Sequence, residues 1–257
     1  WLVALVVMLP FAWPYLRQDW PAMRRRWPYL SLMAILGVTL LNTLIYKGGQ
    51  TTESLNMALL VPTAPILILL LSRVLYGEKI TPPRLAGILV VLAGVVILIS
   101  RGNWERLAAL QINPGDAWAL GGTVCFGLYS LFMRKRGTDI SAVGFSVATF
   151  ALGLLTVAEA LLLPRPVFSV PLLAGLLYAG LGCSALAFWL WTVAIDRIGP
   201  VKASMVYYTL PVFAGAAAVV FLDERVVMAQ IVGGLLILGG VCAATVPFSR
   251  SGSRRKT

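Results

Sequence analysis

The sequence contains no histidine, ten acidic residues and only three cysteines in 257 residues. Without imidazole groups, the chain can form no His-ligated metal site, His-based catalytic triad or His proton relay. Cys125, Cys183 and Cys242 lie far apart within apolar runs, which gives neither a disulfide framework nor a CxxC motif. The composition therefore predicts no metal site, no cofactor and no catalytic residue.

Charge of either sign is also scarce. Charged residues make up 12% of the chain, against roughly 25% in soluble domains, while 59% of the residues are apolar and the mean hydropathy is +0.87. A soluble enzyme of this length is therefore excluded. At about 20 apolar residues per bilayer crossing, the chain has room for roughly ten crossings and little else, so its surroundings are the lipid bilayer.

Nine apolar runs bounded by charge, proline or glycine predict nine membrane helices joined by short connections. They lie at about residues 1–16, 29–46, 54–76, 85–100, 116–133, 140–163, 171–195, 199–222 and 226–247. The first run has no initiator methionine, charged leader or cleavage site, and we do not interpret it as a signal peptide. The sequence predicts an all-α integral membrane protein.

The net charge of +11 would suggest nucleic acid as a partner of a soluble protein. Here we expect no nucleic acid and interpret the basic residues as orientation signals. One side of the predicted bundle carries 16 of the 21 basic residues, and the other side carries Lys47, Arg101, Arg106, Arg165 and Arg225. This bias predicts that the richer side, with the C-terminal tail, is cytoplasmic in a multi-pass protein of the inner or plasma membrane.

An internal repeat appears when the chain is shifted on itself by 146 residues. The offset superposes Thr63 on Thr209, Pro65 on Pro211, Glu78 on Glu224, Gly87 on Gly233 and Gly94 on Gly240. It repeats the third and fourth runs as the eighth and ninth, and an odd number of crossings per repeat inverts the second copy. Inverted repeats are typical of secondary transporters.

The fifth run, residues 116–133, has no partner under this offset. We therefore expect the intact protein to begin about 25–30 residues earlier, with one more span and ten helices in all. The predicted organisation is a first repeat at 1–100 that lacks its first helix, an external linker at 101–115, a second repeat at 116–248 and a basic cytoplasmic tail at 249–257.

Two stretches carry a family resemblance: GDAWALGGTVCFGLYSLFMRKRG (Gly115–Gly137) and FWLWTVAIDRIGPVKASMVYYTLPVFAGAAAVVFLDERVVMAQIVGGLLILGGV (Phe188–Val241). They resemble the second repeat of EamA-type members of the drug/metabolite transporter superfamily, and residues 42–95 fit the first repeat more loosely. The resemblance implies two inverted five-helix repeats that move small metabolites or xenobiotics by alternating access, often as exporters.

Pro65 and Pro211 lie within apolar runs, each two residues after a threonine. A proline cannot donate to the carbonyl four residues earlier, so the Val61 and Tyr207 carbonyls need other partners at bilayer depth. The breaks are either packing kinks satisfied by neighbouring hydroxyls, including those of Thr63 and Thr209, or moving elements that line a central cavity. Both interpretations remain open.

Few polar side chains lie at depth. The candidates for a substrate cavity are Asn42, Tyr46, Asn56, Thr63, Ser184, Tyr207, Tyr208 and Thr209. Tyr46 and Tyr129 lie near helix ends, where a tyrosine usually belongs to the interfacial belt. Tyr207 and Tyr208 lie some 12 Å into their run at 1.5 Å per residue, and adjacent helical positions face different directions, so at least one should face protein or water.

Glu159 is a weak candidate for ion coupling, because it lies five residues before Pro164 and can also reach the interface. Asp116 begins a predicted helix, where a carboxylate is favourable. Lys202 could attract an anionic substrate or simply extend to the membrane surface.

The leading hypothesis is a secondary active transporter, and more specifically an exporter of small organic molecules. A membrane-embedded enzyme is disfavoured because no catalytic constellation is evident. The alternative is a non-transporting membrane subunit, or a lipid flippase component, on the same fold.

The charge bias generates a topology prediction. We expect reporter fusions after Thr257 to report a cytoplasmic location and fusions within residues 101–115 to report an external one, because basic connections are retained inside. Periplasmic reporter activity at Thr257 would contradict the inverted orientation.

Overall fold

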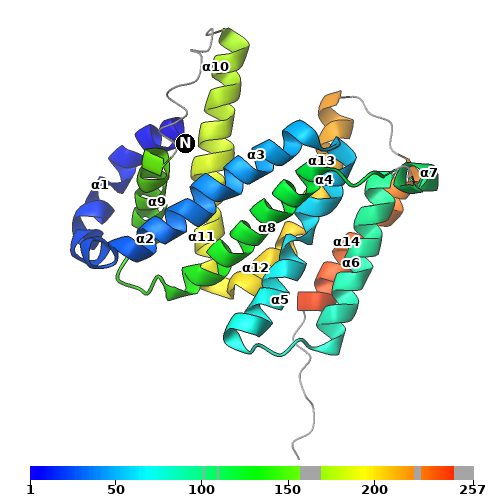
Figure 1. Cartoon of the computed structure of the whole chain (residues 1–257), viewed down its shortest axis with the longest axis horizontal. Coiled ribbons are helices and arrows are strands. Elements are labelled where there is room, and N and C mark those ends of the chain that lie inside the picture. Colours follow the sequence, from blue (N-terminus) through cyan, green and yellow to red (C-terminus); the bar gives the residue numbers. More distant parts are fainter. Residues whose placement is uncertain (101, 109, 157–168, 223–226, 246–257) are drawn as a thin grey trace, which may run out of the picture. The chain divides into compact units, whose positions relative to one another are not determined.

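The structure, a computed structural model, describes residues 1–100, 102–108, 110–156, 169–222 and 227–245; within these ranges it contains helices and connections but no strand (Figure 1). The chain forms two compact units. The first comprises Trp1–Gly77 and Leu110–Ser204, and the second comprises the described parts of Glu78–Ala109 and Met205–Thr257. Each unit thus combines segments from both halves of the sequence.

The helices of the first unit are α1 (Leu2–Arg25), α2 (Trp27–Ala34), η1 (Ile35–Leu40), α3 (Leu41–Thr51), α4 (Ser54–Leu60), η2 (Val61–Thr63), α5 (Ala64–Tyr76), α8 (Pro114–Phe132), η3 (Met133–Lys135), α9 (Ala142–Thr156), α10 (Val170–Leu177), η5 (Tyr178–Leu186) and α11 (Ala187–Ile198). α12 (Pro200–Tyr207) leads from the first unit into the second. The second unit contains α6 (Pro82–Ser100), α7 (Trp104–Ala108), α13 (Leu210–Leu222) and α14 (Met228–Thr245).

Among the described residues, four continuous helical spans are long and apolar enough to cross a bilayer: Trp27–Thr51, Asn56–Tyr76, Pro82–Ser100 and Val170–Ile198. Shorter apolar helices cover Ala142–Thr156 and Met228–Ala244. The prediction of an all-α, multi-pass membrane protein is confirmed.

The first helix extends beyond the predicted end of its apolar run at residue 16 and reaches Arg25. A tertiary contact stabilises its polar last turns: buried Asp19 accepts hydrogen bonds from the backbone N–H and the hydroxyl of Ser141, at 2.8 and 2.6 Å. Arg25 and Arg26 form ion pairs with Asp139 at 3.3 and 3.1 Å. Hydropathy alone could not locate this end, because the residues that stabilise it lie more than 110 positions later in the chain.

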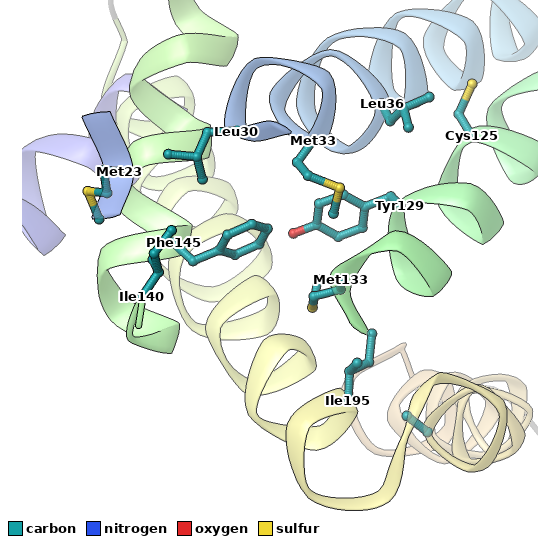
Figure 2. Close-up of a cluster of buried hydrophobic side chains, with 11 residues drawn as sticks. Met23, Leu30, Met33, Leu36, Cys125, Tyr129, Met133, Ile140, Phe145 and Ile195 are labelled. Carbon is teal, nitrogen blue, oxygen red and sulfur yellow. The ribbon is translucent and has the colours of Figure 1, made fainter. Parts of the chain in front are cut away.

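The core of the first unit gathers around Tyr129 of α8 (Figure 2). Figure 2 shows its ring between Met33 and Met133, with the hydroxyl directed toward Phe145. The Tyr129 and Phe145 ring centroids are 6.3 Å apart, and the Tyr129 side chain is buried. The interfacial placement predicted for Tyr129 is therefore wrong. Gly37 of η1 lies directly against the Tyr129 ring, and a side chain there would displace it.

In the second unit, α6 and α14 pack side by side through glycines (Figure 1). A Cβ at Gly87 would lie 2.7 Å from the Gly240 carbonyl oxygen, and a Cβ at Gly94 would lie 2.8 Å from the Gly233 carbonyl oxygen. Within a bilayer, small residues allow such close backbone approach and stabilise helix pairs through van der Waals contact.

These contacts are reciprocal under the 146-residue offset. Gly87 lies against Gly240, and its equivalent Gly233 lies against Gly94, which is the equivalent of Gly240. The same holds further along the helices: Ala244 approaches Gly87 as Leu98 approaches Gly233. The contacts made by α6 on α14 are therefore matched by the equivalent contacts of α14 on α6.

The α6–α14 contact predicts unequal effects at adjacent glycines of α14. Gly240→Leu should lower the free energy of unfolding by about 1–3 kcal/mol, because the new side chain overpacks the interface. Gly239→Leu is the matched control, since a Cβ at Gly239 meets no atom within 4 Å. Melting temperatures of the purified variants in detergent measure the difference, and equal melting temperatures would contradict this packing.

Candidate functional site

Two helix breaks occur at positions that the 146-residue offset makes equivalent. In the first unit, the 3-10 turn η2 separates α4 from α5, and Pro65 is the second residue of α5. In the second unit, the turn at Tyr208 and Thr209 separates α12 from α13, and Pro211 is the second residue of α13.

The two breaks share one hydrogen-bond pattern. The Thr63 hydroxyl donates to the Leu60 carbonyl at 2.6 Å, and the Thr209 hydroxyl donates to the Val206 carbonyl at 2.7 Å. Leu60 and Val206 are themselves 146 positions apart. The Val61 carbonyl, which Pro65 cannot serve, accepts instead from the Ala64 N–H. The backbone at these turns is thus satisfied by short local bonds rather than by continuous α-helix.

Two π-helical segments are a second paired feature, which sequence reasoning missed. η1 covers residues 35–40 and η5 covers residues 178–186, so the offset places η1 on the last six residues of η5. π-helical turns interrupt the regular hydrogen-bond register and occur frequently at functional sites. Hydropathy carries no signal for them; the only hint is that their parent spans, of 25 and 29 residues, exceed the length a crossing needs.

Asn42 and Ser184 lie at these segments. The Asn42 side-chain N–H donates at 2.7 Å to the carbonyl of Val38 inside η1. Ser184 lies within η5 and is partly buried. Asn42 therefore supports the irregular backbone of the first span.

A polar cluster joins the start of α8 to α4 in the first unit. The Asp116 carboxylate accepts from the Asn56 side-chain N–H at 2.9 Å, from the Asn113 backbone N–H at 2.9 Å and from the Thr52 hydroxyl. Asn113 and Asp116 form a capping box, which confirms the predicted role of Asp116 at a helix N-terminus. The Asn56 N–H also donates to the Gln111 carbonyl at 2.8 Å.

Asn56 retains one unused group in this cluster. Its side chain is 7% exposed, and its carbonyl oxygen has no hydrogen-bond partner among the described residues. Leaving a buried acceptor unpaired costs about 1–3 kcal/mol, so this oxygen is an unsatisfied acceptor within the described part of the first unit.

The tyrosine candidates differ in their surroundings. Tyr208 is buried, and its hydroxyl has no hydrogen-bond partner among the described residues, while Tyr207 is partly buried. Tyr46 of α3 is 68% exposed. Glu159, Glu224 and Arg225 lie outside the described residues. Within the described residues, no group of three His, Cys, Asp or Glu side chains could hold a metal ion.

Comparisons with known proteins agree on a family. The EamA-like transporter family matches residues 1–100 and 113–246. The chain is 26% identical over 219 residues to a Bacillus subtilis protein named uncharacterized transporter YyaM, covering 83% of this chain and 72% of the relative. It is 31% identical over 187 residues to the aromatic amino acid exporter YddG of Ancylobacter novellus, covering 71% and 63%. A crystal structure with 22% identity superposes with a TM-score of 0.76 over 95% of this chain and 83% of that one, so its fold is similar.

Proposed function

The chain belongs to the EamA-like transporter family, and on that premise we propose that it is a secondary active transporter that exports small organic metabolites or xenobiotics by alternating access. The observation that carries the proposal is the pair of Thr-x-Pro helix breaks at equivalent positions of the repeat. Interrupted helices at corresponding positions of two repeats mark the binding region in secondary transporters.

The proposed architecture is an inverted repeat. The reciprocal glycine contacts of α6 and α14 support it, because each contact recurs with the two helices exchanged. The matched turns and the matched π-helical segments point the same way. Two copies of one repeat with opposite orientations provide two nearly equivalent arrangements, one open to each side of the membrane.

The helix breaks serve as hinges in this proposal. At each break, a proline removes one backbone donor, and a threonine hydroxyl donates to the carbonyl one residue before the one that the proline leaves free. No continuous α-helical ladder of hydrogen bonds runs through such a turn. Its backbone angles can therefore change without breaking one. Hinges in proteins are a few residues at element ends that absorb such changes.

Each unit offers neutral groups as candidate substrate contacts. In the first unit these are Asn56, whose carbonyl oxygen has no hydrogen-bond partner among the described residues, and the hydroxyls of Thr63 and Ser184. In the second unit they are the aromatic rings and hydroxyls of Tyr207 and Tyr208 and the hydroxyl of Thr209. These groups suit small amphiphilic molecules, and aromatic amino acids are suitable first test substrates because a relative is named for exporting them.

Membrane location and ion coupling complete the proposal. We place the protein in the inner or plasma membrane with a cytoplasmic C-terminus, on the charge bias of the connections. Glu159 is the candidate for ion coupling because it is the one acidic residue that lies within a predicted apolar run and not at its first position.

The tyrosines test the proposed substrate contact. Tyr207→Ala and Tyr208→Ala should each lower export of a labelled aromatic amino acid from loaded vesicles by about tenfold or more, through loss of aromatic contact with the substrate. Tyr178→Ala is the matched control, since Tyr178 is 74% exposed. Parental rates in both variants, at equal membrane expression, would refute the site.

The prolines test the proposed hinges. Pro65→Ala and Pro211→Ala should lower the maximal transport rate more than they raise the KM, because a restored backbone bond stiffens the turn that must move. Pro82→Ala is the control, since Pro82 is the first residue of α6, where a helix needs no N–H. A change confined to the KM, or no change, would remove the hinge role.

A further inference from the structure

A groove opens beside the junction of α2 and α8 in the first unit. Its volume is about 330 Å³, and its lining residues are Pro28, Tyr29, Leu32, Phe132 and Lys135. The Tyr29 hydroxyl donates to the Phe132 carbonyl at 3.1 Å and so joins the two helices along one wall. The remaining walls are apolar, except where Lys135 reaches the groove.

The groove lies at the start of a candidate membrane span. Pro28 and Tyr29 lie in the first turn of the membrane span Trp27–Thr51, and Leu32 lies about one turn deeper. Trp27, at the start of this span, is 64% exposed. An exposed tryptophan at the end of a span is typical of the headgroup layer. Leu32 is therefore the lining residue farthest along this span from its headgroup end, while Phe132 ends α8 and Lys135 follows in η3.

The positive charge of Lys135 is not compensated locally. Its ammonium nitrogen lies 5.5 Å from the centre of the Phe132 ring, and it forms no salt bridge within the described part of the chain. The neighbouring acids already have arginine partners: Asp139 pairs with Arg25 and Arg26, and Asp196 pairs with Arg136. An additional anion at Lys135 would thus face a cation without displacing an internal pair.

An apolar groove with one cation at its mouth matches a molecule with an anionic head and a hydrocarbon chain. We propose that this groove binds one anionic phospholipid, with the phosphate at Lys135 and the first methylenes against Leu32 and Phe132. Basic pockets between membrane helices bind anionic headgroups in this way. The site depends only on the membrane placement of the α2–α8 junction, and not on the transport activity.

Native mass spectrometry of the purified protein tests the proposal. Titration with phosphatidylglycerol should give one retained lipid, bound about fivefold or more tightly than phosphatidylcholine with the same chains, since a lysine near the surface contributes about that factor. Lys135→Gln should abolish this preference while leaving phosphatidylcholine binding unchanged. Leu32→Trp should weaken binding of both lipids, because the larger ring fills the groove.

Two variants serve as controls, and a competition with inorganic phosphate distinguishes a bound lipid from a soluble anion. Lys79→Gln removes the same charge from an exposed lysine elsewhere, and Leu190→Trp enlarges a similarly exposed leucine on α11; both should bind as the parent does. Equal binding of the two lipids by the parent, or an unchanged preference in Lys135→Gln, would overturn the proposal. Displacement of phosphatidylglycerol by inorganic phosphate at comparable concentration would assign the groove to a soluble anion instead. The parent titration decides the question even if a variant fails to fold.

Discussion

In the hydrocarbon layer of a bilayer, a backbone N–H or C=O group has no water to bond and must find its partner inside the protein. The irregular parts of this chain are arranged around that constraint. At η2, the Ala64 N–H donates to the Val61 carbonyl, which Pro65 leaves free. The Thr63 hydroxyl donates to the Leu60 carbonyl. In the first π-helical segment, the Asn42 side-chain N–H donates to the Val38 carbonyl. Such local bonds let long helices bend or break without leaving these carbonyls unpaired.

Close helix packing is the second element of the structure. Without a strong hydrophobic force between helices in lipid, contact area and close approach determine which helices associate. The glycines of α6 and α14 provide this approach in the second unit, and Gly37 provides it for the Tyr129 ring in the first. Gly87 and Gly94 of α6 are the equivalents of Gly233 and Gly240 of α14 under the 146-residue offset. The same two positions of the repeat therefore provide the small residues on both sides of this contact.

The hydrogen-bonded and ion-paired carboxylates described in the first unit fall into two zones. At one end, Asp116 accepts hydrogen bonds from Thr52, Asn56 and Asn113, which ties the start of α8 to α4. At the other end, Asp19, Asp139 and Asp196 hold the ends of α1, α9 and α11 through Ser141 and arginine partners. Between them lies the apolar core around Tyr129. Charged networks at the ends and a nearly neutral interior suit a protein that anchors its surfaces in headgroup layers.

The sequence by itself determined the class of the protein, the number and rough position of its apolar runs, the offset that relates its halves, and the capping role of Asp116. These features depend on composition, periodicity and local spacing. Tertiary structure alone decided that α1 continues to Arg25, that Tyr129 is buried rather than interfacial, that Asn56 bonds to Asp116, and that π-helical turns interrupt two spans. Each of these depends on partners distant in the chain or on backbone register. Hydropathy reports the depth of a residue in the membrane, but it carries no information about which neighbour that residue will meet.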